Sequence, residues 1–132
     1  MSQYQENATV SRVERLSDTN VRLTLQAPKI CSSAEPGQFV MIRVGVSKDP
    51  LLRRPFCIHQ VRDDGMLQVY YKIVGKGTEI LSSLKEGEQV SVLGPLGRGF
   101  DLTPSGQRIL VGGGLGIASF LEAGMPLKLL PL

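Results

Sequence analysis

Residues 53–84, which read RRPFCIHQVRDDGMLQVYYKIVGKGTEILSSL, contain the elements that decide the fold. The apolar run 55–61 predicts a strand, Asp63-Asp64-Gly65 is a hairpin turn signal, and 66–74 is the expected return strand. Gly75-Lys76-Gly77-Thr78 then leads into a run whose apolar residues fall on one helical face, with Thr78 as the predicted N-cap. The stretch predicts a β-hairpin followed directly by a short helix.

Further strands are expected on both sides of this stretch. Apolar and polar residues alternate strictly over 21–26, which is typical of a strand with one wet face, and 8–16 reads as its partner. Residues 39–44 are apolar on both faces, as in a strand buried in a barrel wall, and 89–93 form the last strand. Residues 28–33 are expected to be irregular. The prediction is an all-β fold, a six-stranded antiparallel Greek-key barrel with one inserted helix.

The character of the chain changes after residue 100. Residues 108–111 predict a buried strand that runs into the glycine run 112–116 and then a helix, which is how an α/β nucleotide-binding domain begins. Too little sequence follows for one complete βαβ unit, which needs roughly 30 residues. We therefore expect a barrel domain at 1–100 and the truncated start of a nucleotide-binding domain, its first strand and helix, at 101–132.

Composition excludes several classes of function. The formal net charge is +3, acidic and basic residues are interleaved, and aromatic residues make up 5% of the chain. The sequence therefore lacks the concentrated basic stripe and the aromatic side chains that a nucleic-acid-binding surface uses. The longest uncharged run, 109–121, is too short for a membrane span, and the N-terminus lacks the apolar core of a signal peptide. Two cysteines, Cys31 and Cys57, form no metal-ligand spacing, which favours a reduced, cytoplasmic protein without a metal site.

Two clusters have the residue types that bind phosphate. Arg54, at the start of the 55–61 strand, offers a planar donor fork for a phosphate, although a surface pair with Arg53 is an equally open interpretation. The glycines of 75–78 would let a diphosphate approach the first amides of the helix, although a glycine turn and a capped helix explain the same residues.

The glycine run 112–116 and the single histidine complete the set of candidates. A run of this kind is weak support for a nucleotide site, because tight packing of a strand against a helix uses the same small residues. His59 lies in the middle of a predicted strand, where a structural role is favoured over proton transfer. No catalytic acid or base is predicted.

The order and spacing of these motifs resemble the ferredoxin-NADP reductase superfamily. Within it, the sequence is most similar to the electron-transfer subunits of bacterial NAD-dependent dihydroorotate dehydrogenases. Related sulfide dehydrogenase and ferredoxin-NADP-reducing subunits contain the same sequence motifs. A non-redox flavin-binding barrel is a further alternative. The matching segments are Pro36-Gly37-Gln38-Phe39, residues 53–58, residues 71–78, residues 93–97 and Val111-Gly112-Gly113-Gly114.

The resemblance implies that FAD lies in a groove along the barrel. By position, Arg54 would contact the diphosphate, and Pro55, Phe56 and Cys57 would line the flavin. Cys57 stands where the family commonly has serine, and a thiol is the weaker hydrogen-bond donor. The remaining residues that the resemblance implies as cofactor contacts are Tyr71, Lys72, Ile73, Gly77, Thr78, Gly113 and Gly114.

The resemblance also implies partners and shows departures. Intact members pass electrons between NAD(P)H, FAD and an FMN-containing catalytic subunit, and their C-terminal half binds the nicotinamide and carries four cysteines for a [2Fe–2S] cluster. Those cysteines do not occur here, so no iron–sulfur centre is expected in this chain. Ser119 follows Ala118 where the family usually has proline. NAD(P) binding would require the missing domain, and the C-terminal segment 122–132 is a candidate surface for self-association.

Overall fold

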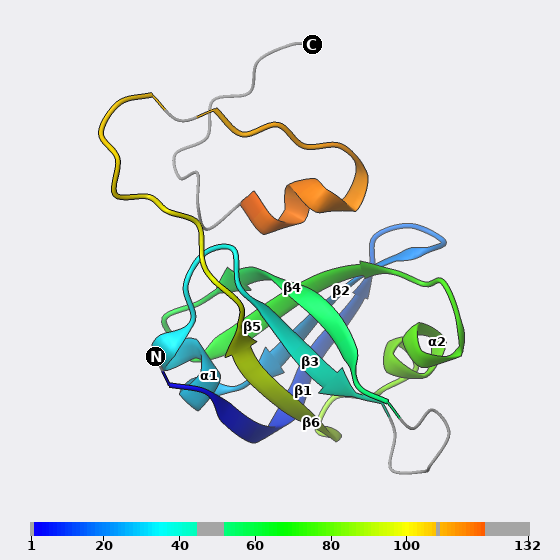
Figure 1. Cartoon of the computed structure of the whole chain (residues 1–132). Helices are drawn as coiled ribbons and strands as arrows, with labels where there is room; N and C mark the ends of the chain where they lie inside the picture. Colours follow the sequence, from blue (N-terminus) through cyan, green and yellow to red (C-terminus); the bar gives the residue numbers. More distant parts are fainter. Residues whose placement is uncertain (1, 45–51, 108, 121–132) are drawn as a thin grey trace.

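Six antiparallel strands close into a barrel in the computed structural model, which describes residues 2–44, 52–107 and 109–120 (Figure 1). The strands follow one another around the barrel in the order β1-β2-β5-β4-β3-β6. Two helices and one 3₁₀ helix complete the described elements. The bounds are β1 Tyr4–Arg15, β2 Asn20–Gln26, α1 Pro28–Ser33, β3 Phe39–Arg43, β4 Arg54–Val61, β5 Met66–Lys72, α2 Lys76–Ser82, β6 Gln89–Leu96 and η1 Gly114–Phe120. The predicted six-stranded barrel is confirmed.

Alternate residues of neighbouring strands fill the barrel. Leu23 of β2 pairs with Val69 of β5, and Leu25 pairs with Leu67; all four side chains have no exposed surface. Because successive side chains of a strand point to opposite faces, this register sends the residues between them to the outer wall. The hairpin between β4 and β5 is also confirmed, and it turns at Gly65, whose φ of +80° favours glycine.

The segment after β2 differs from the expectation. Residues 28–33 are predicted as irregular, but they form α1. Pro28 occupies the first turn, where its missing N–H group has no helical partner to lose. The carboxylate of Glu6 accepts hydrogen bonds from the amides of Lys29 and Ile30, at 3.2 and 3.1 Å. Ile30 is fully buried, so α1 closes one end of the barrel, a tertiary effect that local sequence does not report.

Helix α2 starts earlier than predicted. Its N-cap is Gly75, and Thr78 is the third residue of the helix rather than the cap. The Thr78 hydroxyl bonds back to the turn before the helix, so the same residue stabilises the same end from inside. Leu81 is fully buried, and Ile80 and Leu84 pack against the core, as the predicted apolar face requires.

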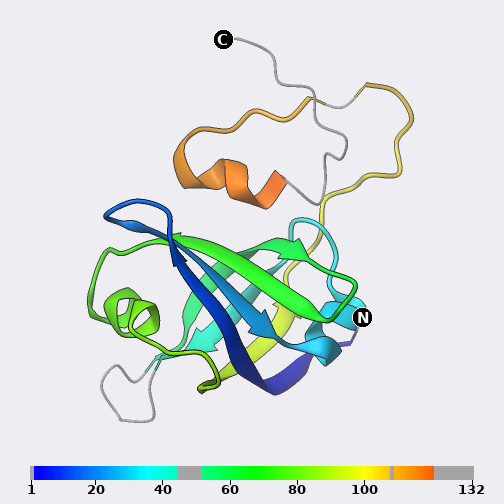
Figure 2. The ribbon, with the colours of Figure 1, turned by 180° about the vertical axis from the view of Figure 1, so that it is seen from behind.

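The chain beyond β6 is not the strand and α-helix that the sequence predicts. Residues 109–111 are irregular, with Ile109 75% and Val111 80% exposed, and 114–120 form the 3₁₀ helix η1. A strand needs a neighbour to bond its backbone, and the described residues offer none at this point. Figures 1 and 2 show this segment beside the barrel. Arg108 and residues 121–132, which complete the predicted strand and tail, lie outside the described residues. Among the described helices, none has the length and apolar character of a membrane span.

Candidate functional site

A cavity of about 400 Å³ opens on the outer wall of the barrel between β4, β5, α2 and η1. Seven of the residues predicted from the sequence line it: Arg54, Pro55, Phe56, Cys57, Tyr71, Lys72 and Thr78. Five more complete the lining: Tyr70, Val74, Leu115, Gly116 and Ala118. Four of the predicted residues, Ile73, Gly77, Gly113 and Gly114, are not among the lining residues. The structure thus brings together most of the predicted site at one place.

The two adjacent arginines diverge. Arg53 turns to the barrel wall, where its guanidinium donates to the Ser91 carbonyl oxygen at 3.0 Å and to the Ser91 hydroxyl at 2.8 Å. Arg54 lines the cavity, and its Nη1 donates to the carbonyl oxygen of Leu52 at 2.9 Å. The structural interpretation therefore holds for Arg53, while Arg54 is the arginine of the pair that lines the cavity.

The Arg54 side chain lies against the first turn of α2. A Cβ atom added to the buried Gly77 would lie 3.4 Å from Arg54 Nε, which is an ordinary contact and shows that the two residues adjoin. The first intrahelical bond of α2 runs from the Glu79 amide to the Gly75 carbonyl oxygen, at 3.0 Å. The amides of residues 77 and 78 precede that bond, in the first turn, where backbone N–H groups lack an intrahelical acceptor. A guanidinium and the amides of a helical turn thus meet at one end of the cavity.

The hydroxyl of Thr78 is occupied by its own turn. Its Oγ1 accepts hydrogen bonds from the amides of Val74 and Gly75, at 2.9 and 3.1 Å, and donates to the Gly75 carbonyl oxygen at 3.0 Å. A hydroxyl has one proton and two lone pairs, so these three bonds use its full capacity. A ligand could therefore form hydrogen bonds with the main chain of Thr78 but not with its hydroxyl.

Tyr71 connects the cavity floor to α2. Ser82 Oγ donates to the Thr78 carbonyl oxygen at 2.6 Å, so the Tyr71 hydroxyl, 3.0 Å from Ser82 Oγ, is the donor of that bond. Burial raises the pKa of the Tyr71 hydroxyl above its ordinary value, and the ring packs edge-on against Phe56 with centroids 5.4 Å apart. The Tyr71 side chain therefore points into the barrel, and its neighbours Tyr70 and Lys72 point to the cavity side.

Alternation along β5 is the signal that could have identified Tyr70. The inward residues of β5 are Leu67, Val69 and Tyr71, so the residue between the last two must face outward with Lys72. Ile73 follows β5, and its amide donates to the Thr19 carbonyl oxygen at 2.7 Å. Of the three lining residues in η1, Leu115 and Gly116 belong to the glycine run 112–116, whereas no sequence pattern points to Ala118.

The end of the glycine run and the residue Ala118 after it supply one wall of the cavity, through Leu115, Gly116 and Ala118. The Nδ1 atom of His59 lies 2.7 Å from the Ala118 carbonyl oxygen, which joins η1 to the outer face of β4. Gly112 allows the chain to fold back, because an added Cβ would lie 2.9 Å from a ring carbon of Phe120. Around Gly113 and Gly114 an added Cβ would meet nothing within 4 Å. The described contacts thus assign those two glycines no close neighbour.

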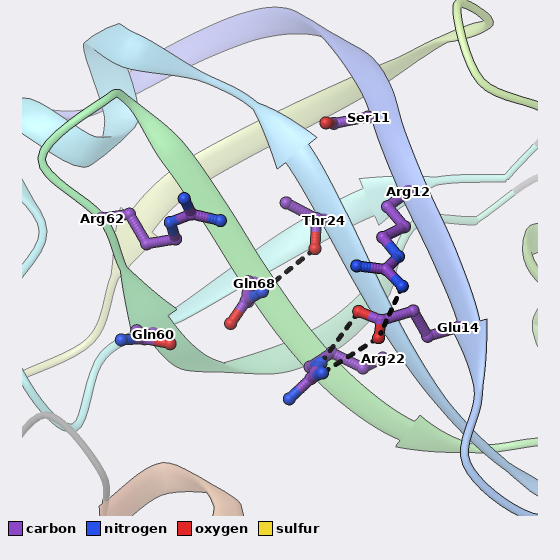
Figure 3. Close-up of a pocket in the computed structure, with 8 residues that line it drawn as sticks. All are labelled: Ser11, Arg12, Glu14, Arg22, Thr24, Gln60, Arg62 and Gln68. Atoms are coloured by element: carbon purple, nitrogen blue, oxygen red, sulfur yellow. Dashed lines mark hydrogen bonds and ion pairs between the residues drawn. The ribbon is translucent and has the colours of Figure 1, made fainter.

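A second hollow, of about 310 Å³, lies farther along the outer wall on β1, β2, β4 and β5 (Figure 3). The carboxylate of Glu14 accepts two bonds from the Arg22 guanidinium, at 3.1 and 3.0 Å, and these bonds lower the pKa of Glu14. Beside them the Gln68 amide donates to the Thr24 hydroxyl at 3.1 Å, and Gln68 Oε1 has no partner among the described residues. The principal charges here pair with each other, and no predicted cofactor contact lines this hollow.

Comparisons with known proteins agree with this arrangement. Residues 7–100 match the family described as an oxidoreductase FAD-binding domain. The chain is 46% identical over 114 residues to the dihydroorotate dehydrogenase B (NAD(+)) electron transfer subunit of Desulforamulus reducens, covering 85% of this chain and 44% of that protein. The subunit of the same name from Geobacillus thermodenitrificans is 41% identical over 121 residues, covering 89% and 47%. The chain spans about half the length of the curated relatives it matches.

Comparisons with solved structures also match the barrel to oxidoreductases. A chain from the NADH-dependent reduced ferredoxin-NADP oxidoreductase structure superposes with a TM-score of 0.79 at 30% identity, covering 88% of this chain and 42% of that chain. The Amycolatopsis cytochrome P450 reductase GcoB superposes with a TM-score of 0.74 at 26% identity, covering 91% and 38%. In both comparisons the shared part includes most of the barrel chain and less than half of the larger protein.

Proposed function

Since the chain belongs to the oxidoreductase FAD-binding domain family, we propose that the cavity between β4, β5, α2 and η1 binds FAD. The observation that carries this proposal is the position of Arg54 against Gly77. A guanidinium is a two-point donor for phosphate, and the amides of a helical turn without intrahelical acceptors add further donors. The diphosphate would lie between them, where a glycine leaves room for it.

The shape and polarity of the cavity fit the rest of the cofactor. One end holds the Arg54 guanidinium and Lys72 lies on β5, while much of the remaining lining is aromatic or aliphatic, including Tyr70, Val74 and Leu115. A flat apolar ring suits such walls, and a polar group at one end fixes its direction. Large exposed apolar side chains occur at the same place, since Val74 is 78% exposed, and a bound ring would cover them.

We assign the remaining contacts by position. Pro55, Phe56 and Cys57 would present their main chain to the flavin, and Tyr71, Lys72 and Ile73 would run beside it. FAD, when bound, supplies the redox chemistry, whereas these residues bind and orient it. Since Cys57 is exposed on β4, its thiol would face the ring as a weak donor. Gly113 and Gly114 would belong to the nicotinamide side of the site.

At the level of the whole protein, we propose an electron-transfer component of an NAD-dependent dihydroorotate dehydrogenase. The names of the relatives at 46% and 41% identity support this assignment, and they imply a catalytic partner subunit, which we propose carries FMN. Nicotinamide contacts would require sequence beyond the barrel. The two free cysteines agree with a reducing compartment, and we propose the cytoplasm. Self-association would use segment 122–132.

A second candidate is a ferredoxin-NADP reductase subunit of the same superfamily. It is favoured by the solved NADH-dependent reduced ferredoxin-NADP oxidoreductase, a chain of which is 30% identical to this one over the aligned part. Both candidates place FAD in the same cavity and differ in the partner that exchanges electrons with it. Chemical reduction of the bound flavin, followed by mixing with a dihydroorotate dehydrogenase catalytic subunit, separates them without nicotinamide. Flavin reoxidation coupled to orotate reduction supports the first candidate, and electron transfer to ferredoxin alone supports the second.

Titration of the purified chain with FAD tests the binding proposal directly. We expect saturable quenching of flavin fluorescence, with weaker binding of riboflavin, which lacks the phosphates that Arg54 would contact. A yellow protein on purification would be the simplest positive result. Absence of quenching at FAD concentrations on the order of tens of micromolar would refute the proposal, because a bond pattern of this kind should yield at least that affinity.

A further inference from the structure

His59 lies on the outer face of β4, at the edge of the proposed flavin cavity. Its Nδ1 atom is 2.7 Å from the carbonyl oxygen of Ala118 in η1. A carbonyl oxygen only accepts, so Nδ1 must carry the proton of this bond. The ring also packs at a tilt against Tyr70, with centroids 6.0 Å apart. Two contacts in different directions therefore fix the imidazole.

The segment that His59 holds has little support of its own. Helix η1 is a 3₁₀ helix of seven residues, in which Ile117 is 51% and Leu115 is 36% exposed. The 3₁₀ geometry gives poorer hydrogen bonds than the α-helix, and a short exposed segment opens readily. Besides a ring contact between Phe120 and Phe100, with centroids 6.1 Å apart, the segment has the directional bond to His59, which can therefore affect where the segment lies. Its residues Leu115, Gly116 and Ala118 form a wall of the cavity.

We propose that His59 is a positioning residue: its Nδ1–H group anchors the backbone of η1 to β4 and thereby sets the wall of the flavin cavity opposite the strands. The anchoring depends on geometry that is independent of any cofactor, while its effect on flavin rests on the proposed function. His59 needs no proton transfer for this role, which agrees with the structural interpretation of the sequence.

The proton position gives a direct test. Because His59 is the single histidine of the chain, long-range nitrogen–proton NMR spectra of the labelled protein contain one imidazole. At a pH where the ring is neutral, we expect the Nδ1–H tautomer. The Nε2–H tautomer at that pH would overturn the proposal, since its Nδ1 cannot donate to Ala118.

Two substitutions separate the bond from the bulk of the ring. In His59→Asn the side-chain amide nitrogen can take the place of Nδ1, whereas in His59→Gln it reaches the place of Nε2. Hydrogen exchange of amides 114–120, measured without flavin, should stay within about twofold of wild type in His59→Asn and rise about two- to tenfold in His59→Gln, the range of one net hydrogen bond. FAD affinity should fall by a similar factor in His59→Gln only.

The exchange rates of the two variants, His59→Asn and His59→Gln, decide whether the Nδ1–H bond anchors η1. Equal exchange in the two variants and the wild type would show that the bond does not hold η1. Equal loss in both would assign the effect to packing of the ring on Tyr70, and would also overturn the proposal. If the chain bound no FAD while the tautomer and the exchange rates agreed with expectation, the flavin proposal would fail and the anchoring role would stand.

Discussion

Replacing Gly77 by alanine should separate the stability of the chain from its affinity for FAD. The residue is buried in the first turn of α2, its backbone φ lies outside the left-handed region, and the new Cβ would lie 3.4 Å from Arg54 Nε, an ordinary contact. Glycine costs a helix about 1 kcal/mol relative to alanine. We therefore expect the free energy of unfolding to rise by up to about 1 kcal/mol.

The same methyl group would occupy the space between the guanidinium and the amides of the turn. Loss of one hydrogen bond to a charged group costs about 1.5–3 kcal/mol, which corresponds to a roughly 10- to 150-fold weaker FAD affinity. The assays are urea unfolding without FAD and fluorescence titration with FAD. Gly75→Ala is the matched control, since its added Cβ meets nothing within 4 Å. Unchanged FAD affinity in Gly77→Ala, with the stability gain observed, would refute the proposed place of the diphosphate.

Three other comparisons follow from the site. Arg54→Ala should weaken FAD binding at least about tenfold with little change in stability, whereas Arg53→Ala should destabilise the barrel by about 1–3 kcal/mol, measured by urea unfolding. Tyr71→Phe should cost about 1 kcal/mol in unfolding free energy through its bond to α2, and an unchanged value would show that this bond contributes nothing. A thiol reagent at pH 8 should modify the exposed Cys57 and spare Cys31, because burial raises the pKa of Cys31 to about 11; saturating FAD should slow modification of Cys57.

Periodicity was sufficient to predict the barrel. The strict alternation of β2 and the turn signal at Asp63-Asp64-Gly65 each correspond to a local physical requirement, namely one buried face and one glycine-permitting φ. Helix α1 was beyond such reasoning, because Glu6, more than twenty residues earlier in the chain, supplies acceptors for its first amides. Interactions between distant segments of this kind leave no local pattern.

The pair Arg53 and Arg54 shows where prediction of the site from sequence ends. Successive residues at a strand start point to opposite sides, so one arginine of the pair must face the cavity while the other lies against the wall. The resemblance selected Arg54, and its position against Gly77 is consistent with that choice. The bonds of Arg53 to Ser91 depend on the register between β3 and β6. That register cannot be predicted from residues 53–58 alone.

Prediction failed most clearly in the segment after β6, and the failure is itself informative about the site. Residues 108–111 and the glycine run have the sequence of a buried strand and turn, yet the described part has no neighbouring strand to bond them. Two contacts that the sequence does not predict help to hold this segment, the bond from His59 to a main-chain oxygen of η1 and the packing of Phe120 on Phe100. A cavity wall held by few such contacts is more easily moved by a single substitution than the opposite wall, which is formed by the paired strands β4 and β5. We therefore expect substitutions on the η1 side to alter the affinity and environment of the flavin while the barrel stays intact.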